Sequence, residues 1–198
     1  LRAAVGTVSG TTISYGSEYE IGGGTRRTVN AFDVSYDSQS NAVVVSYCYQ
    51  NGAGGITTYI VQGLTVSGTA ITVNGTNFDH AGSGAFALND VRIECDNKGG
   101  FVMSYMKTNG EWYVRAGTVS SAGAIAVGSE VGSITSVQGG LDHGLALAYD
   151  GNSDRWAVLS RASNNTVYSA VISRSGTTVT NETGSASSVI GSVLNSFF

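Results

Sequence analysis

The sequence predicts an all-β fold of repeated four-stranded antiparallel units, on the basis of three observations. The first is a recurring phrase, seen at Gly6–Ser14, Leu64–Thr72, Gly117–Gly128 and Ile172–Thr180. The second is a phrase that ends in Asp at positions 37, 96 and 150, with spacings of 59 and 54 residues. The third is composition: 28 glycines and no proline among 198 residues supply turns without the residue that interrupts strand pairing. A period slightly above 50 residues is typical of repeat architectures such as propeller blades.

The first complete unit, residues 30–88, contains four runs of β-branched and aromatic residues. These runs are NAFDVSYD, AVVVSYCYQ, TTYIVQGLTV and TAITV, and the turn sequences SQSN, NGAGG and SG separate them. A Gly-containing pair between apolar β runs indicates a hairpin, because one central residue needs a positive φ. Three successive hairpins predict an antiparallel meander.

Two further units follow the same plan, at 89–142 and 143–194. Residues 1–29 match the second half of a unit and its connection, whereas 195–198 match the start of another unit. We therefore expect one repeat domain that is an excerpt of a longer chain. The alternative is that subunits exchange strands to complete the partial units.

A β-propeller, or part of one, is the architecture that these repeats favour, and a stacked β-meander fibre is the alternative. Three and a half units fall short of the ~4–8 blades of a usual ring, so closure needs more chain or a second copy. The polar segments after each fourth strand, such as Asn74–Ala87, are expected to be loops on one binding face.

Charge and composition exclude several kinds of partner. The net charge is −4, and no basic run exceeds Arg26-Arg27, which argues against nucleic acid. No apolar stretch approaches the roughly 18 residues of a membrane span, so we expect no membrane insertion. Cys48 and Cys95 occupy different strand positions and are expected to be free thiols, with no disulfide and no metal site.

The phrase AVGTVSGTTISYGSE, followed by VSYDSQSNAVVVSY, resembles a repeat found in virion proteins of marine tailed bacteriophages. Every unit of the chain carries a version, with the best copies at Val5–Glu18 and Val34–Tyr47, whereas the third unit departs most. The resemblance implies propeller-like β repeats and a tail-fibre-like, host-attachment role on the virion or outside the cell. The implied partners are other virion proteins, further copies of this chain and a host surface glycan.

Candidate chemistry is sparse, and we expect a protein without enzymatic activity or cofactor. An Asp before a tight turn caps backbone N–H groups, and this explains Asp37, Asp96 and Asp150. The segment Asp150–Asp154 resembles the start of a calcium loop but lacks the later bidentate Glu. His80 and His143 each follow an Asp, yet no nucleophile motif on a strand–helix elbow accompanies them.

A carbohydrate-active propeller enzyme, such as a glycan depolymerase, is the alternative function. Glycoside hydrolysis needs two carboxylates held across a cleft. Glu111, Asp142 and Asp154 are candidates, but their spacing does not pair them.

Two sets of residues are candidates for ligand binding. Asn30, Asn89, His143 and Asn195 all open a first strand, which lines the central channel of a propeller. They either form a polar ring for water, an ion or a small ligand, or they hydrogen-bond neighbouring blades. Trp112 and Trp156 either stack on sugars at exposed loop edges or fill space between blades.

Overall fold

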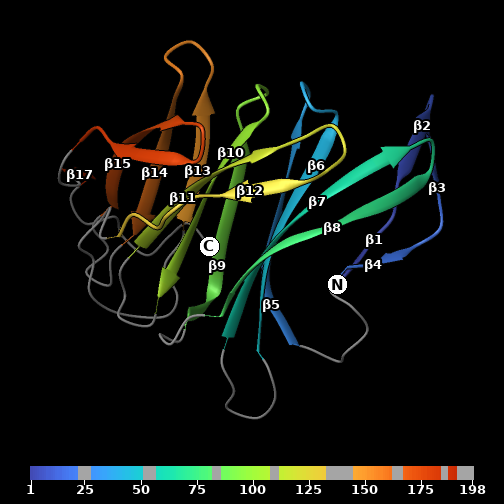
Figure 1. Ribbon diagram of the computed structural model, residues 1–198, viewed down its shortest axis with the longest axis horizontal. Coiled ribbons are helices and arrows are strands. Elements are labelled where there is room, and N and C mark those ends of the chain that lie inside the picture. The colour runs from blue at the N-terminus through green and yellow to red at the C-terminus, as the bar shows by residue number, and fades with distance from the viewer. Residues whose placement is uncertain are drawn as a thin grey trace.

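The protein is all-β in the computed structural model, as the sequence predicts (Figure 1). The structure describes residues 1–21, 28–50, 57–81, 86–107, 112–132, 145–161, 167–183 and 187–190, and no helix occurs among them. The strands are β1 (Arg2–Ala3), β2 (Gly6–Ser9), β3 (Thr12–Tyr15), β4 (Tyr19–Glu20), β5 (Thr28–Asp37), β6 (Ala42–Gln50), β7 (Thr57–Ser67), β8 (Ala70–Ala81), β9 (Phe86–Cys95), β10 (Gly100–Lys107), β11 (Trp112–Val119), β12 (Ile125–Val127), β13 (Leu145–Asp150), β14 (Arg155–Arg161), β15 (Val167–Ser175), β16 (Thr178–Asn181) and β17 (Ser187–Ile190).

Three antiparallel meanders follow one another along the chain, and we call them the first, second and third repeat. Their strand orders are β5-β6-β7-β8, β9-β10-β11-β12 and β13-β14-β15-β16, and β17 adds a fifth strand beside β15. The hairpin β2–β3 and the pair β1–β4 precede them and form an N-terminal half-repeat. This succession confirms the four-stranded antiparallel plan.

The fourth strand of each unit runs along the third strand in two parts. In the first repeat a register shift between Gln62 and Leu64 divides β8. In the second repeat β12 is followed by a bridge from Val131 to Val114, and in the third repeat β16 is followed by β17. The half-repeat has the same two-part pairing, because β3 pairs with β2 and β4 pairs with β1. Residues 1–21 therefore have the form of a third and fourth strand.

Each hairpin between a third and a fourth strand turns on a glycine in the left-handed region. The φ angles of Gly10, Gly68, Gly123 and Gly176 lie between 58° and 76°. An L-residue with a side chain rarely adopts this conformation. The recurring Ser-Gly and Ala-Gly pairs of the sequence are therefore turn residues, as predicted.

The sheets pack face to face, with one apolar layer between each pair of neighbours. Val45, Tyr47 and Ile60 face the half-repeat, whereas Val44, Cys48 and Val61 on the alternate positions face the second repeat. A third layer joins the second repeat to the third. Because successive side chains of a strand point to opposite faces, one sheet contributes to two layers.

One predicted connection differs from the structure. Asn74–Ala87 was expected to be a polar loop, but β8 continues to Ala81 and β9 begins at Phe86. The reason is that β7 is 11 residues long, and its first half pairs with Asn77–Ala81. Strand pairing satisfies the backbone groups of this polar segment, although its side chains carry little strand signal.

The first strands of the three repeats lie next to one another. The strand β9 packs against β5 on one side and against β13 on the other (Figure 1). None of the described sheets closes on itself. The structure therefore establishes an all-β array of four-stranded sheets, and a propeller stays a prediction.

Candidate functional site: the repeat interfaces and the open N-terminal face

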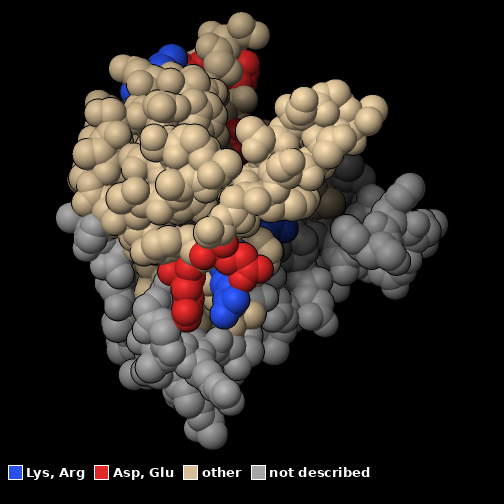
Figure 2. All heavy atoms as spheres, turned by 90° about the vertical axis from the view of Figure 1, so that its right-hand side faces the viewer, with Lys and Arg blue, Asp and Glu red and all other residues tan. Residues whose placement is uncertain are grey.

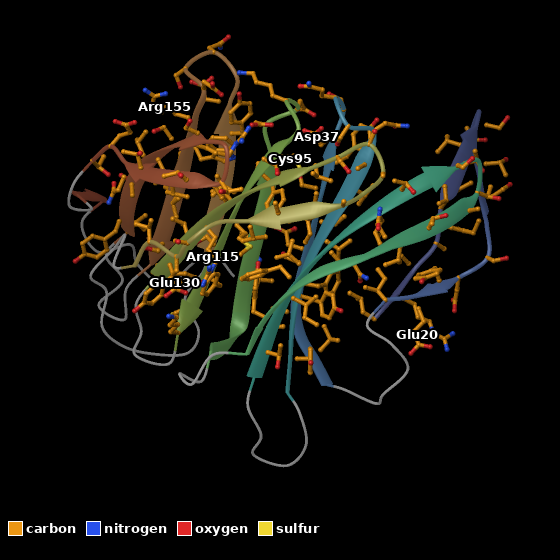
Figure 3. All side chains as sticks on the ribbon, viewed as in Figure 1. Glu20, Asp37, Cys95, Arg115, Glu130 and Arg155 are labelled. Carbon is orange, nitrogen blue, oxygen red and sulfur yellow. The ribbon has the colours of Figure 1, made fainter. Side chains whose placement is uncertain are left out.

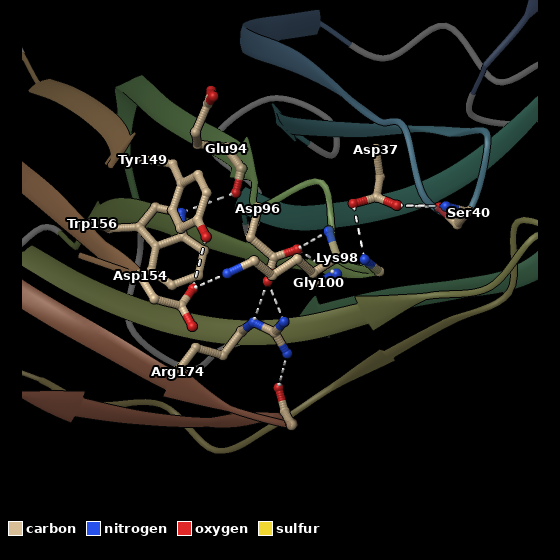
Figure 4. Close-up of polar contacts among 12 residues, drawn as sticks. Asp37, Ser40, Glu94, Asp96, Lys98, Gly100, Tyr149, Asp154, Trp156 and Arg174 are labelled. Atoms are coloured by element: carbon tan, nitrogen blue, oxygen red, sulfur yellow. Dashed lines mark hydrogen bonds and ion pairs between the residues drawn. The ribbon is translucent and has the colours of Figure 1, made fainter. Parts of the chain in front are cut away.

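Asp37 caps its own turn and also binds the next repeat. Its Oδ1 atom accepts hydrogen bonds from the N–H and the hydroxyl of Ser40, both at 2.7 Å. Its Oδ2 atom accepts a hydrogen bond from the N–H of Gly99 in the second repeat, at 3.0 Å (Figure 4). The predicted capping role is confirmed, and the structure adds a bond between repeats that the sequence did not indicate.

Asp96 has the same double role between the second and third repeats. Its Oδ1 atom accepts hydrogen bonds from the N–H groups of Lys98 and Gly100, at 2.8 and 2.9 Å. Its Oδ2 atom accepts hydrogen bonds from the guanidinium group of Arg174, whose Nε lies 3.1 Å away (Figure 4). Asp150 also caps its turn, through the N–H of Asn152 and the hydroxyl of Ser153, but it is exposed.

Side chains of β5 and the backbone of β9 form further bonds across the first interface. Asp33 and Ser35 accept hydrogen bonds from the N–H groups of Ile93 and Cys95, at 2.9 and 3.0 Å. At the second interface the indole Nε1 of Trp156 donates to the carbonyl of Glu94, at 3.3 Å. Polar contacts thus fix the position of each first strand on its neighbour.

A third kind of contact joins the half-repeat, the first repeat and the second repeat, each to the repeat that follows it. A Cβ atom on Gly16 would meet the carbonyl of Thr69, and one on Gly128 would meet the carbonyl of Thr177. At the matching place in the first repeat, the side-chain amide of Asn74 donates to the carbonyl of Ala122. The three carbonyls belong to Thr69, Ala122 and Thr177. Each of these residues is next to a glycine with a positive φ angle in a turn of the following repeat. The half-repeat is therefore joined to the first repeat in the same way as the complete repeats are joined to one another.

The face of each first strand that points toward the preceding repeat is apolar. In β9 this face carries Val91, Ile93 and Cys95, which are buried against the first repeat. In β13 it carries Leu147 and Tyr149, which pack against the second repeat. This layer is the main apolar contribution of the first strands to each interface.

In β5 the corresponding face is open. Phe32, Val34 and Tyr36 are 59%, 56% and 52% exposed. Residues 1–21 cover β6 and β7, and no described strand packs against this face of β5. A stripe that is buried in the second repeat therefore faces outward in the first.

The half-repeat extends this open surface. Val8 pairs with Ile13 and Gly6 with Tyr15, so Val8, Ile13 and Tyr15 share one face of the hairpin, where they are 70%, 53% and 73% exposed. The equivalent residues of the second repeat, Val119 and Ile125, pack against the first repeat. We call the exposed set the N-terminal face, and it consists of Val8, Ile13, Tyr15, Phe32, Val34 and Tyr36.

Charge is sparse on this side of the molecule. Figure 2 views it from the side of β2 and β3, and most of the described surface there is uncharged, with Lys, Arg, Asp and Glu confined to small groups. The exposed pair Arg2–Glu18, with 2.6 Å between Nη1 and Oε2, lies in the half-repeat. The six exposed apolar side chains of the N-terminal face come from β2, β3 and β5.

A compact polar cluster lies in the second repeat, where Glu130 faces Arg115 (Figure 3). Glu130 binds Lys107 and the hydroxyl of Tyr105, and Arg115 Nε donates to the same hydroxyl at 3.1 Å. Burial by itself would raise the pKa of Glu130, but the hydrogen bonds from Lys107 and Tyr105 and the nearby positive charges hold it below the usual value. Glu130 is thus a paired carboxylate and not a proton donor at neutral pH.

Asp33 and Glu94 form a second group of interest, because their carboxylates lie on adjacent first strands. Burial and the charge of Asp33 raise the pKa of Glu94. Asp33 accepts backbone N–H groups at both oxygens, from Val34 and Ile93, each at 2.9 Å. Sequence reasoning missed this pair, because the two residues are 61 positions apart and only the contact of β5 with β9 brings them together.

The predicted glycan-stacking role of Trp112 and Trp156 is wrong in this structure. Each indole is 1% exposed and lies in the apolar layer between the second and third repeats. Their large rings are buried because the layer between two sheets needs such volume. The alternative that they fill space between repeats is confirmed.

The predicted channel residues are described only in part. Asn30 lies in β5 and Asn89 in β9, both near the start of a first strand. His143 and Asn195 lie outside the described residues, as do Glu111 and Asp142 among the carboxylate candidates. Asp154 is exposed and bound to Lys98 Nζ at 3.1 Å and to the hydroxyl of Tyr149 at 2.7 Å. The polar ring stays a prediction.

Cys48 and Cys95 are both buried free thiols, as predicted. Within the described ranges no group of three or more His, Cys, Asp or Glu side chains could hold a metal ion. A search of the same residues finds no helix with the length and apolar character needed to cross a membrane. No protein-family model, curated protein or solved structure matches the chain.

Proposed function

We propose that this chain is a non-enzymatic structural segment of a tailed-phage virion, located in a tail-fibre-like or other surface protein, where it self-assembles and contacts host glycans. The observation that carries the self-assembly is the recurring interface, in which each repeat buries an apolar face against its neighbour. The virion role rests on the resemblance of the repeated phrase to marine phage virion proteins.

The repeat interfaces support a structural role. Buried layers, capped turns and bonds between repeats all serve to hold the sheets in a fixed order. In an array of this kind each unit contacts only its neighbours, and the stability of the whole is about the sum of the repeats and the interfaces between them. We further propose that the units are successive blades of a propeller-like array, in which β5, β9 and β13 are the inner strands.

Virion location and host contact can be tested separately. Antibodies raised against the chain should label the surface of intact phage particles in electron microscopy, and a fluorescent form of the chain should bind host cells. Added host polysaccharide should compete for this binding. Particles that carry no label, in a preparation where denatured particles react on a blot, would contradict a surface location.

A carbohydrate-active enzyme is the second candidate function, and the Asp33–Glu94 pair is the observation that favours it. Burial, with a contribution from the charge of Asp33, raises the pKa of Glu94, and a raised pKa is a property that a carboxylic general acid requires. Host polysaccharide incubated with the chain would then be cleaved, and Glu94→Gln would abolish cleavage. Glu18→Gln, which changes an exposed carboxylate of the half-repeat, is the matched control. We expect no cleavage by the parent chain.

A further inference from the structure

We propose that Tyr59 and Tyr105 are a site of oxidative cross-linking, at which a carbon–carbon bond between the two rings joins the first repeat to the second. This modification goes beyond the proposed function and does not depend on the virion role. Three observations support it: the two rings are in contact, a carboxylate is placed to take the proton of Tyr105, and a third tyrosine leads from Tyr105 toward the surface.

The two rings meet where the sheets of the first and second repeats pack together. Tyr59 lies in β7 and Tyr105 in β10, and both are buried in the same apolar layer. Their ring centroids are 4.9 Å apart, with 31° between the ring planes. Aromatic pairs in contact span about 4.5–7 Å, so this pair is near the short end of the range. A small rotation of the rings brings together the carbons next to the hydroxyl groups, which are the positions at which oxidised tyrosines couple.

Glu130 is placed to take the proton that Tyr105 loses on oxidation. The hydroxyl of Tyr105 donates a hydrogen bond to Glu130 Oε2, and Arg115 Nε donates to the same hydroxyl at 3.1 Å. Burial alone would raise the pKa of Glu130, but the hydrogen bonds from Lys107 and Tyr105 hold it below the usual value. Glu130 is therefore a carboxylate at neutral pH and accepts a proton. Loss of an electron makes a tyrosine hydroxyl strongly acidic, so the proton moves to Glu130 as the electron leaves.

Tyr113 provides the route by which that electron leaves the interior. Its ring stacks on the ring of Tyr105, with 6.2 Å between centroids and 15° between planes. Tyr113 is partly exposed, whereas Tyr105 is buried. Lys107 Nζ lies 4.0 Å from the centre of the Tyr113 ring, and this positive charge disfavours a second positive charge on the ring. The oxidised state therefore passes from Tyr113 to Tyr105, where Glu130 takes the proton.

The reaction uses two equivalents of a one-electron oxidant. Tyr105 gives one electron to the oxidant and its hydroxyl proton to Glu130, which leaves a neutral tyrosyl radical. A ring carbon of this radical then bonds to a ring carbon of Tyr59. A second electron goes to the oxidant and the displaced ring proton of Tyr59 goes to solvent, while the displaced ring proton of Tyr105 moves to its own oxygen. Both rings are aromatic again, and the product has two hydrogen atoms fewer than the parent chain.

Photo-oxidation of the full chain with a ruthenium trisbipyridine complex and persulfate tests the proposal. The monomeric fraction is isolated on a denaturing gel, so that bonds between copies at exposed tyrosines do not count. This fraction should show dityrosine fluorescence. Mass spectrometry of its tryptic digest should find the peptide 28–92 joined to the peptide 99–107, with the bond between Tyr59 and Tyr105.

Three single variants locate the bond. Tyr59→Phe and Tyr105→Phe each keep the buried ring and remove its hydroxyl, so each should fold and should abolish the linked peptide. Tyr47→Phe is the matched control, because Tyr47 is also buried but its ring lies 6.4 Å from that of Tyr49 on the same strand. This variant should give the linked peptide in the same yield as the parent. Circular dichroism and the melting temperature check that each variant is folded.

A fourth variant tests the proton acceptor. Glu130→Gln keeps a side chain that forms hydrogen bonds but does not take up a proton at neutral pH. Cross-linking should be at least about tenfold slower in this variant, because a positioned proton acceptor contributes at least that much to a rate. A folded Glu130→Gln chain that cross-links as fast as the parent would overturn the role of Glu130.

Three further results would overturn the proposal as a whole. The first is a monomeric parent chain without dityrosine. The second is a linked peptide that persists in Tyr59→Phe or Tyr105→Phe. The third is coupling of Tyr59 to the thiol of Cys48, its partner in the pairing of β6 with β7, in place of the bond to Tyr105. Each of these results leaves the virion and host-binding proposals to their own tests.

Discussion

Oδ2 of Asp96 and Nε of Arg174 lie 3.1 Å apart although 78 positions separate the two residues in the chain. The Asp96 side chain is 1% exposed and that of Arg174 is 12% exposed, so the pair is almost excluded from water. It joins the turn after β9 to the end of β15 and so connects the second repeat to the third. The pair shows how a residue with a local task, the capping of a turn, also holds two repeats together.

Breaking this pair should destabilise the protein strongly. Arg174→Met would leave the Asp96 carboxylate buried without its cationic partner, and we expect a loss of about 2–4 kcal/mol in the free energy of unfolding. The two remaining N–H donors to Asp96 keep the loss below that of a wholly unpaired charge. Urea denaturation at neutral pH measures it.

The matched control is Arg155→Met. Arg155 Nε lies 3.7 Å from Glu182 Oε1, and the two side chains are 41% and 39% exposed. An ion pair in contact with water contributes at most about 1 kcal/mol. Equal losses in the two variants would show that the buried pair has no special role.

The close approach of neighbouring repeats at Gly128 should make this position intolerant of a side chain. A Cβ atom there would meet the backbone carbonyl of Thr177, which cannot move without displacing the turn of the third repeat. Gly128→Ala should cost about 1–3 kcal/mol of unfolding free energy. In Gly151→Ala the new Cβ would lie 3.7 Å from the ring of Tyr149, and the change should stay within about 0.5 kcal/mol. Thermal denaturation of both variants measures the difference.

Buried acidic groups should make the protein less stable at high pH. Burial is the largest cause that raises the pKa of the Cys95 thiol from its usual range to about 12. Below about pH 8 the thiol is mostly protonated in both states and adds little pH dependence. Between pH 9 and 12 the unfolded chain releases this proton and the folded chain retains it, so stability falls as the pH rises. Burial also raises the pKa of Tyr105, with the same sign.

Cys95→Ala isolates the thiol contribution. The parent should lose more unfolding free energy between pH 8 and 10.5 than this variant does, by about 1–2 kcal/mol. Neither Cys48 nor Cys95 should react with a thiol reagent in the folded protein at pH 8, because both are buried. An identical pH dependence in parent and variant would contradict the assignment.

The positions of Trp112 and Trp156 predict their spectroscopic behaviour. Both indoles are 1% exposed, so tryptophan emission should be blue-shifted and should not respond to added saccharides. Trp156→Phe should cost about 1–3 kcal/mol, because it removes buried volume and the hydrogen bond to the Glu94 carbonyl. The variant should retain any binding to host cells under native conditions. A saccharide-dependent change in emission would restore the stacking hypothesis.

Local features of the fold were predictable from the sequence. Apolar residues in the runs around Val44 and Val102 are continuous or alternate with polar ones, which is typical of strands. The glycines at positions 10, 68, 123 and 176 mark hairpins, because a left-handed turn needs a residue without a side chain. The capping role of Asp37 and Asp96 was also predictable, since an Asp reaches the N–H groups two to four residues later. Each of these conclusions depends on residues that are close in the chain.

The candidate site was not predictable in the same way. Phe32, Val34 and Tyr36 have the same strand pattern as Val91, Ile93 and Cys95, and the sequence does not distinguish the exposed stripe from the buried one. Trp112 and Trp156 were compatible with both an exposed and a buried position. Which of these side chains meets water depends on whether another sheet lies in front of it.

The sequence by itself therefore determined the β content, the repeat length and the chemistry of the turns, because strand alternation and positive φ angles are properties of short segments. The tertiary structure alone decided which face of each sheet is covered, that Asp96 meets Arg174, and that one apolar stripe is left open. Those outcomes depend on the order in which sheets stack, and stacking brings together residues that the chain holds about 60 or more positions apart.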